Sequence, residues 1–276
     1  MFDVGCWMVF IPKMTTAPEP STQPAIEMRG VSVGSMRDLN TIVVEDVNWS
    51  VKQGDWWVIS GLQGSGKSDF LTLTGGMMAP ASGTYHFLGK EMPIFEDDRL
   101  PDRLKLGFVF ENGQLFNHLT IAENISLPLR YHKNLSMVDA EAEVQKLLEL
   151  TELGPFADST PGAIARNWQR RAGLARALML RPEVLLLDNP LAGLDLRHRV
   201  WWTNLLEQLS RGHEWLNGRP LTLVVTTNDL RLWRGGKRQF ALLKEKRFIV
   251  LGGWAEVEAA SDELVREMRA AELQEQ

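Results

Sequence analysis

Residues 61–68 read Gly-Leu-Gln-Gly-Ser-Gly-Lys-Ser, which fits the pattern G-x-x-x-x-G-K-[ST]. Glycines let backbone N–H groups turn inward around phosphate oxygens, and a helix that follows adds the favourable dipole of its N-terminus. The Lys67 ammonium would reach the outer phosphates of a nucleotide, and the Ser68 hydroxyl would ligate magnesium. A glycine turn with only a structural role is the alternative, which the strand-like run before the loop and the helical pattern after it disfavour. The candidate phosphate-binding residues are Gly61, Gly64, Ser65, Gly66, Lys67 and Ser68.

A candidate magnesium ligand lies much further along the chain. Asp188 follows the apolar run Val184–Leu187, which has the length and composition of a buried strand. A carboxylate at a strand end beside a phosphate-binding loop holds the metal ion in many nucleotide-hydrolysing proteins. Many buried strands end in Asp, so Asp188 alone is weak evidence for a metal site. The loop at 61–68 makes this assignment stronger. The two features together predict a site for ATP and Mg²⁺, with Ser68 and Asp188 as metal ligands.

The segments that carry these residues predict strands alternating with helices. The apolar run Trp56–Ser60 enters the loop, and the periodic stretch Asp69–Thr74 follows it. Val184–Leu187 and Leu221–Thr226 are further buried-strand candidates, separated by a helical pattern at Trp201–Leu209. Such alternation is typical of a parallel sheet covered by helices.

Two other regions accompany this core. Ile26–Val33 and Thr41–Val51 are short apolar stretches between turn residues, which predict a small antiparallel sheet. Val138–Leu150 and Ala172–Met179 have helical periodicity, which predicts a helical insert at about 112–176. We therefore expect an α/β fold with a parallel-sheet core, a small antiparallel β subdomain and an inserted α-helical subdomain.

The expected domain boundaries follow from composition. Residues 1–24 are rich in Thr, Pro and Ser towards their end, and we expect a disordered leader there, with Met14 as an alternative start of the chain. The nucleotide-binding domain is expected at 25–253 and a C-terminal helical tail at 254–276, where the charged stretch Ser261–Glu275 predicts an amphipathic helix or a frayed tail.

Composition excludes several classes of function. The chain has 276 residues, of which 44% are hydrophobic, and a formal net charge of -5. That charge gives no overall electrostatic footprint for nucleic acid, so we expect no nucleic-acid partner. The single cysteine, Cys6, cannot form an internal disulfide, which fits a reducing compartment such as the cytoplasm. No run of about 18 apolar residues occurs, so we expect no membrane span.

Together these residues resemble the ATP-binding subunits of ABC transporters, from Ala25 to Gly253. The loop at 61–68 corresponds to the Walker A motif, and Asp188 corresponds to the Walker B aspartate of this P-loop NTPase fold, whose core is RecA-like. Within the family the chain is most similar to the Mla-type ATPases of lipid transport and organic-solvent resistance. Four stretches carry this closer likeness: Leu73–Pro80, Phe108–Phe116, Asn124–Arg130 and Arg170–Ala177.

The resemblance implies partners and a location. Two ATP-binding subunits, as a homodimer or a heterodimer, would close head to tail over two ATP molecules. Each site would pair the phosphate loop of one chain with the signature loop of the other, and Asp195 matches the family's dimer-contact loop. Closure would move transmembrane permease subunits, so the chain would be cytoplasmic and peripheral on the cytoplasmic face of the inner membrane.

The sequence departs from the family at positions used for hydrolysis. Asn189 stands where the family has a glutamate general base, and a neutral amide cannot accept a proton from water near pH 7, which costs about 10²–10⁴-fold in rate. Asn228 occupies the switch-histidine position and can still hydrogen-bond a γ-phosphate. Glu111 replaces a glutamine that follows the strand at 108–110, beside the metal.

The signature loop departs as well. The family's Leu-Ser-Gly-Gly aligns with Ile164–Trp168, which keeps neither the serine nor the glycines. Arg166 is either a solvated residue before a helix or a guanidinium aimed at the γ-phosphate on the opposite chain. Trp168 is interpreted as packing, and the aromatic residue that stacks on adenine in the family is not evident near Val33–Met36.

Two functions remain open, and with them whether the chain is an active enzyme. The first is an energy-coupling subunit for lipid or other apolar solute transport, with slow or absent hydrolysis at its own site. The second is a nucleotide-gated structural or regulatory subunit, since binding that favours one state needs no hydrolysis. A further hypothesis is that Glu111 and Asn189 have exchanged roles, which would leave one carboxylate near the attacking water.

The remaining conspicuous residues have simpler interpretations. Trp56-Trp57 and Trp201-Trp202 lie beside periodic apolar stretches and indicate packing. His118 and His132 lack metal-ligand spacing. The pair Arg170-Arg171 is interpreted as a solvated helix face or a neighbour of the phosphate site.

Overall fold

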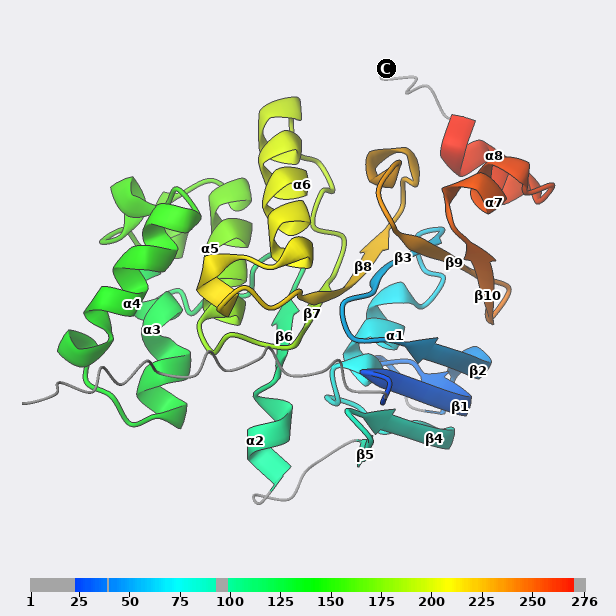
Figure 1. Cartoon of the computed structure of the whole chain (residues 1–276), viewed down its shortest axis with the longest axis horizontal. Coiled ribbons are helices and arrows are strands. Elements are labelled where there is room, and N and C mark those ends of the chain that lie inside the picture. The colour runs from blue at the N-terminus through cyan, green and yellow to red at the C-terminus, as the bar shows by residue number, and fades with distance from the viewer. Residues whose placement is uncertain (1–22, 39, 93–98, 271–276) are drawn as a thin grey trace, which may run out of the picture.

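The computed structural model describes residues 23–38, 40–92 and 99–270, which form a ten-stranded sheet with helices packed against it (Figure 1). The order of its strands is β5-β4-β1-β2-β10-β9-β3-β8-β7-β6. The predicted leader, 1–24, lies almost wholly outside the described residues, and its disorder stays a prediction. The strands are β1 Ile26–Gly34, β2 Ile42–Val51, β3 Trp56–Gly61, β4 Ser82–Phe87, β5 Lys90–Met92, β6 Leu106–Val109, β7 Val184–Leu187, β8 Thr222–Thr227, β9 Gln239–Lys244 and β10 Arg247–Gly252.

The half of the sheet that contains β3, the strand before the phosphate loop, has parallel strands. β9, β3, β8, β7 and β6 are neighbours in that order, and each adjacent pair is parallel. Every residue of β3, β7 and β8 is buried, which is the pattern of strands covered on both faces. The predicted parallel core is therefore confirmed. Its strands end at one common edge, where the candidate site residues follow β3, β6, β7 and β8.

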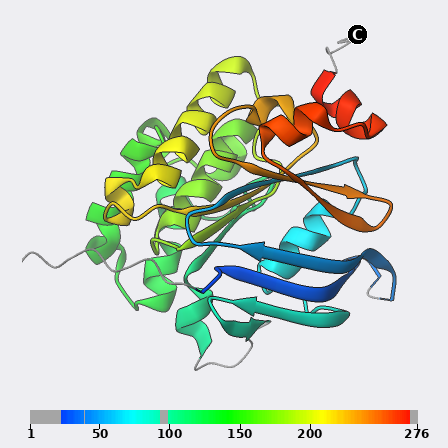
Figure 2. The same cartoon turned by 45° about the vertical axis from the view of Figure 1, so that its right-hand side comes forward.

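Antiparallel pairing organises the other half. β1 pairs with β2 and β4, and β4 pairs with β5, all antiparallel, which confirms the predicted small antiparallel sheet. β10 joins the two halves, because it is antiparallel to β9 and meets β2 in a parallel bridge. Figure 2 shows the antiparallel strands stacked below the β9–β10 hairpin, with helix α1 (Lys67–Thr74) beside them.

Three α-helices follow β6 in the chain and precede β7: α3 Ile121–His132, α4 Met137–Leu150 and α5 Arg166–Leu178 (Figure 1). Capping boxes start the first two, with Thr120 and Ser136 as N-caps. The N-cap of α5 is Ala165, which offers no side-chain cap. Helices were predicted in this part of the chain, and they are present. The division into a domain at 25–253, an insert at 112–176 and a tail at 254–276 stays a prediction.

The sheet separates two hydrophobic clusters. Successive residues of β3 alternate between them, so that Trp56 contributes to the cluster under α3–α6 and Trp57 to the cluster around α1. Helix α6, Leu196–Arg211, buries Trp202 completely and packs Trp201 against the first cluster. The packing interpretation of both tryptophan pairs is confirmed. A strand embedded in two cores explains why its sequence is apolar without alternation.

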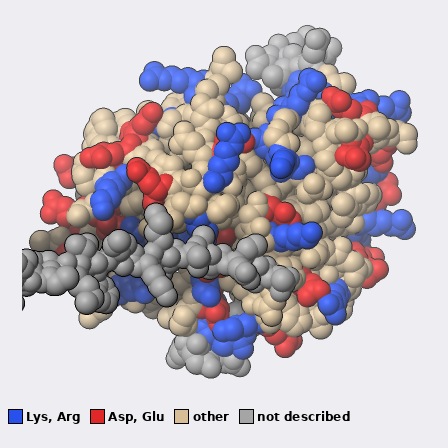
Figure 3. Space-filling view, in the orientation of Figure 1, with Lys and Arg blue, Asp and Glu red and all other residues tan. Residues whose placement is uncertain are grey.

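The remaining helices are short, and α8 carries the predicted amphipathic pattern. It buries Leu264, Val265 and Met268 and exposes charged residues between them. Among the described residues no helix is long and apolar enough to cross a membrane. On the face shown in Figure 3, basic and acidic side chains are interspersed. The remaining α-helices are α2 Leu100–Arg103, α7 Trp254–Ala259 and α8 Glu263–Ala270.

The solvated-face interpretation of Arg170-Arg171 is wrong. Their exposed fractions are 9% and 1%, because helix α5 is enclosed by neighbouring elements. The Arg170 guanidinium donates to the carbonyl of Ala192, and that of Arg171 donates to the Glu152 carboxylate. Both arginines are thus part of the interior of the molecule.

Candidate functional site

The loop between β3 and α1 has a backbone that requires glycine at several positions. Gly64 and Gly66 have φ angles of +81° and +89°, in the left-handed region that favours glycine. A Cβ on Gly66 would lie 3.2 Å from a Val43 methyl, and one on Gly61 would lie 2.6 Å from the Leu243 carbonyl oxygen. These glycines therefore hold a tight turn directly before the N-terminus of α1.

Lys67 lies folded over this loop. Its ammonium donates hydrogen bonds to the carbonyl oxygens of Gly61 and Leu62, each at 2.7 Å. Burial lowers the pKa of Lys67 from 10.5 to about 8, while the carboxylates of Asp188 and Glu111 oppose the shift. The lysine is thus a desolvated cation beside two carboxylates, and incoming phosphate oxygens would favour its charged form.

Asp188 is held at the end of β7 by backbone and side-chain contacts. Its N–H donates to the Val109 carbonyl of β6, at 2.8 Å. The Thr226 hydroxyl donates to the Asp188 carboxylate at 2.7 Å and accepts from the Asn189 N–H at 2.9 Å. Sequence reasoning did not identify Thr226 as a site residue. The signal for it is weak, because β8 is a fully buried strand with three threonines, and each buried hydroxyl requires a polar partner.

Asn189 and Glu111 come together across β7 and β6. The Asn189 amide nitrogen donates to a Glu111 carboxylate oxygen at 3.2 Å. The Asn189 backbone has a φ of +46°, which asparagine adopts more readily than most residues. The residue is therefore suited to this sharp turn, and its amide is turned to a carboxylate from the neighbouring strand.

A cavity of about 710 Å³ opens over these groups. It brings together the predicted loop, metal, base and switch residues, including Asn228, which follows β8. Met36 and Arg37 also line it; the adenine-stacking position was expected near Val33–Met36 without a residue being assigned, and Arg37 was not identified from the sequence. The lining residues are Ser35, Met36, Arg37, Val43, Gln63, Gly64, Gly66, Lys67, Ser68, Asp69, Glu111, Asp188, Asn189, Ala192 and Asn228.

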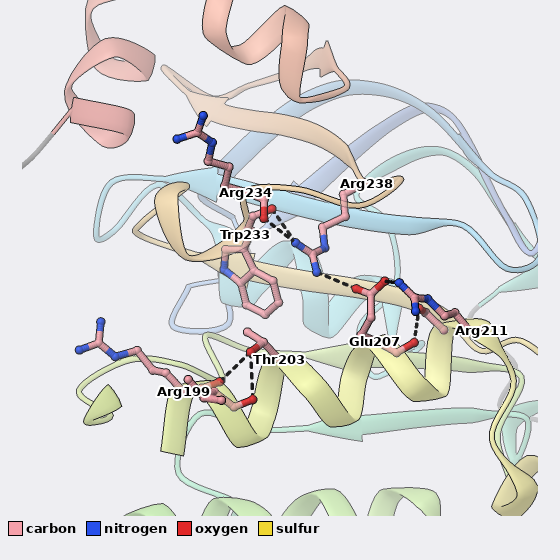
Figure 4. A network of polar contacts seen from close by, with 9 residues as sticks. Arg199, Thr203, Glu207, Arg211, Trp233, Arg234 and Arg238 are labelled. Atoms are coloured by element: carbon pink, nitrogen blue, oxygen red, sulfur yellow. Dashed lines mark hydrogen bonds and ion pairs between the residues drawn. The ribbon is translucent and has the colours of Figure 1, made fainter. Parts of the chain in front are cut away.

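A buried arginine network holds the segment after Asn228. Arg238 is 8% exposed and donates to the Trp233 carbonyl at 2.8 Å and to the Glu207 carboxylate of α6 at 2.9 Å (Figure 4). Its guanidinium also lies over the Trp56 ring of β3, 4.1 Å from the centroid. The chain beyond the switch position is thus fixed to both α6 and the central strand.

Gly61 and Ser65 of the loop do not line this cavity, and neither do three predicted site residues elsewhere in the chain. Arg166 is exposed at the first turn of α5, and Asp195 is exposed at the N-cap of α6, where its carboxylate accepts from the His198 N–H. Trp168 packs edge-on against His198, with ring centroids 5.2 Å apart, which confirms its packing role. These residues belong to a second surface of the chain, at the α5/α6 junction.

The cavity fits a nucleotide with magnesium. Among the described residues, the Lys67 ammonium is bound only to carbonyls of its own loop. Phosphate oxygens would offer this cation charged partners. Ser68 and Asp188 would hold Mg²⁺, which in such sites takes one or two protein ligands together with phosphates and water. Bound magnesium would neutralise charge on the phosphates.

A phosphate loop between a parallel strand and a helix, with a strand-end aspartate beside it, defines a P-loop nucleotide-binding protein of the α/β class. Residues 44–192 match the family described as ABC transporter, and this match spans the loop, Glu111 and Asn189. The chain belongs to this family and carries its ATP-binding domain.

Curated relatives and solved structures agree with this assignment. The chain is 34% identical over 214 residues to the spermidine/putrescine import ATP-binding protein PotA of Trichodesmium erythraeum, covering 78% of this chain and 53% of that protein. It is also 34% identical over 214 residues to a probable sulfate/thiosulfate import ATP-binding protein CysA of Chlorella vulgaris, covering 78% of this chain and 86% of the relative. It spans about half the length of several curated relatives that it matches.

The dimeric structure of MJ0796, a bacterial ABC transporter cassette, has a TM-score of 0.70 with 30% sequence identity and covers 81% of this chain and 96% of that chain. A dimeric post-hydrolysis state of the same cassette, bound to ADP and Pi, has a TM-score of 0.71 with 29% identity, covering 81% and 96% of the two chains. The fold expected from sequence is thereby confirmed as that of an ABC ATPase.

Proposed function

We propose that this chain is the ATP-binding subunit of an ABC transporter for a lipid or another apolar solute, and that ATP binding rather than rapid hydrolysis drives its partners. The observation that carries the proposal is the convergence of Lys67, Ser68 and Asp188 on one cavity of about 710 Å³. These groups supply the cation, the hydroxyl and the carboxylate that hold MgATP.

Slow hydrolysis follows from the side chain at the base position. Asn189 follows the metal-site aspartate, and its amide cannot take a proton from water. It donates to Glu111 instead, at 3.2 Å. The site therefore keeps the groups for binding and loses the usual base.

ATP binding without hydrolysis can drive a conformational change if it stabilises one arrangement of the two subunits more than the other. Arg166, Trp168 and Asp195 lie outside the cavity at the α5/α6 junction, where they would face the ATP of a second subunit, either identical or different. ATP between the two subunits would then stabilise the closed pair relative to the open one.

The membrane partner would dock on a separate groove. A groove of about 410 Å³ beside α3 is lined by Phe110, Phe116, Pro128 and Tyr131, among others. Phe116 and Tyr131 expose 53% and 82% of their surface, which is unusual for large apolar or amphipathic side chains and typical of interaction sites. Transmembrane permease subunits would place the chain in the cytoplasm, on the cytoplasmic face of the inner membrane.

The apolar solute is proposed from the Mla-like stretches in the sequence. Relatives of the chain include spermidine/putrescine and sulfate/thiosulfate import proteins, so the proposed solute rests on this chain's own residues. A nucleotide-gated regulatory subunit without hydrolysis is the second candidate, and the amide at Asn189 is the observation that favours it.

The decisive experiment measures ATP binding and turnover of the chain purified with its membrane partners. Lys67→Ala is the matched variant, and we expect it to weaken ATP binding by about 10²-fold, because it removes a charge-assisted contact from a desolvated site. Slow turnover above the Lys67→Ala level supports the transporter function. Turnover at that level with intact binding supports the regulatory candidate, and wild-type binding no tighter than that of Lys67→Ala contradicts both.

A further inference from the structure

Three carboxylates line the nucleotide cavity, and two of them, Asp69 and Asp188, already have other roles. Asp69 accepts a hydrogen bond from the Met36 N–H at 2.6 Å, which ties α1 to the loop after β1. Asp188 accepts from the Thr226 hydroxyl at 2.7 Å and is the proposed metal ligand. Glu111 accepts only from the Asn189 amide among the described residues, and its second carboxylate oxygen has no partner there.

We propose that Glu111 is the general base for the slow hydrolysis of ATP at this site, and that Asn189 is the positioning residue that orients its carboxylate. The inference rests on the proposed ATP-binding function and deepens it, since it assigns the source of whatever turnover the chain has. It makes Glu111 the side chain that contacts the attacking water.

The sheet itself brings the pair together. β6 and β7 are parallel, with Val109 opposite Leu187, so the residues that follow the two strands emerge side by side at the same edge. Glu111 and Asn189 each lie two residues beyond this pair of partners. A carboxylate lost from one strand end is thus replaced by a carboxylate from the neighbouring strand end.

Contacts with helix α5 fix the turn that carries Glu111. Gly113 has a φ of +72°, and a Cβ on it would lie 2.4 Å from the Gln169 carbonyl oxygen of α5. The Arg176 guanidinium donates to the Gly113 carbonyl at 2.9 Å. This turn is therefore packed against α5, which limits where the Glu111 carboxylate can lie.

Chemistry settles which way the Asn189 amide faces. A carboxylate only accepts hydrogen bonds, so the amide must present its NH₂ group to Glu111. The Asn189 backbone is anchored in turn, since its N–H donates to the Thr226 hydroxyl at 2.9 Å. Two neighbouring cations, Lys67 and Arg170, both have pKa values lowered by burial, and Glu111 opposes the shift of each.

The step balances without any further reactant. A lone pair of the water oxygen attacks the γ-phosphorus, while a carboxylate oxygen of Glu111 takes one water proton. The bond between the γ-phosphorus and the β–γ bridging oxygen breaks, and ADP leaves with the electron pair of that bond. Glu111 then releases the proton to solvent or to the departing phosphate. Lys67 and the metal ion would stabilise the charge on the phosphates.

The test compares Glu111→Gln with wild type in the complete assembly, at saturating ATP and Mg²⁺. We expect turnover to fall by about 10²-fold or to the Lys67→Ala level, whichever is reached first, with ATP affinity within about threefold of wild type. Glu141→Gln is the matched control, because Glu141 is an exposed glutamate on α4, and it should turn over as wild type does. A swap variant, Glu111→Gln with Asn189→Glu, should restore turnover, since it returns a carboxylate to the β7 side.

Three results would overturn the inference. The first is a Glu111→Gln variant as active as wild type, while Lys67→Ala is inactive. The second is a loss that higher Mg²⁺ concentration fully recovers, because Glu111 would then be a metal ligand and not a base. The third is wild-type turnover at the Lys67→Ala level with intact ATP binding, which removes the base role but leaves the ATP-binding function standing. Failure of wild type to bind ATP would instead refute the proposed function itself.

Discussion

The phosphate loop and the α5/α6 junction differ in the hydrogen-bond partners of their polar side chains. Among the described residues, the Lys67 ammonium is bound only to carbonyls of its own loop, and the Ser65 hydroxyl has no partner. At the junction, the Arg171 guanidinium donates to Glu152 at 2.7 Å and stacks 3.6 Å from the centroid of the Trp201 ring. The loop keeps its cation for a ligand, whereas the junction uses both terminal nitrogens of Arg171 within the chain and leaves only its Nε without a partner among the described residues.

The junction is a closed arginine–aromatic cluster, which we define as Glu152, Asn167, Trp168, Arg171, His198 and Trp201. Arginine only donates, so the His198 Nδ1 atom, 3.0 Å from Arg171, must accept. The Asn167 amide nitrogen lies next to the His198 Nε2 atom. Both nitrogens of the imidazole therefore contact residues of the chain itself.

The comparison has a functional meaning. At the position predicted for the family's signature loop, the chain has this packed cluster at the start of α5. Substitutions there should therefore act mainly on stability, and substitutions in the loop should act mainly on nucleotide binding. Three predictions test this division, in order of decreasing effect.

The largest effect is expected from Arg171→Ala. The substitution removes a guanidinium and its stem from between two indole rings, and it leaves Thr151 and Glu152 without their donor. We expect the free energy of unfolding to fall by about 3 kcal/mol, with unchanged ATP affinity. Denaturant unfolding of the purified chain measures the first quantity, and nucleotide titration measures the second.

Arg197→Ala is the matched control for this prediction, because Arg197 is an exposed arginine on α6. It should change the free energy of unfolding by no more than about 0.5 kcal/mol. An Arg171→Ala variant that unfolds like wild type but binds ATP poorly would reverse the comparison and assign the cluster to the nucleotide site.

Sequence reasoning predicted the loop, its neighbours and the sheet because these features are local. The glycine spacing at 61–68 and the apolar run Val184–Leu187 each carry their own signal, and both lie where that signal indicates. Arg171 was misjudged because its partners come from the turn after α4, from α5 and from α6, which only the tertiary fold brings together. From sequence alone a charged residue is expected to be exposed to solvent, because its partners in the fold are not yet known.

The site itself was predicted in part for the same reason. Lys67, Ser68 and Asp188 were found from motif spacing, and the Glu111–Asn189 contact was raised as an exchange of roles. Thr226 and Arg37 were not identified as site residues, because neither belongs to a pattern of its own. Their place in the site depends on strand register and on the loop after β1.

The second prediction is that the binding of one nucleotide takes up about half a proton at pH 8. The pKa of Lys67 is lowered from 10.5 to about 8, so about half of the free chain carries a neutral lysine at that pH. Phosphate favours the charged form, so ATP binding should take up protons near pH 8 and almost none at pH 6.5. ATP affinity should accordingly fall as the pH rises above 8.

Calorimetric titration at pH 8 in two buffers of different ionisation enthalpy measures this uptake. Lys67→Met should abolish it, whereas Lys52→Met, at an exposed lysine, should leave it intact. Equal apparent enthalpies in both buffers for the wild-type chain would show that Lys67 is already fully charged in the free protein, and that the loop is less desolvated than its geometry indicates.

The smallest effect is expected from Arg166→Ala. Arg166 is exposed, lies at the first turn of α5 and does not line the cavity, so a single chain should bind ATP with affinity unchanged within about twofold. Its proposed role begins only when a second subunit brings an ATP to this surface. An exposed guanidinium then adds electrostatic attraction of modest size, and we expect ATP-promoted self-association to weaken by about three- to tenfold.

Sedimentation of the chain with and without ATP measures that association, with Arg197→Ala as the neighbouring control. Self-association unaffected by Arg166→Ala would make this arginine a solvated residue, which was the alternative interpretation of the sequence. An Arg166→Ala variant that loses ATP affinity as a single chain would contradict the division between the two regions, because it would connect the start of α5 to the phosphate loop of the same molecule.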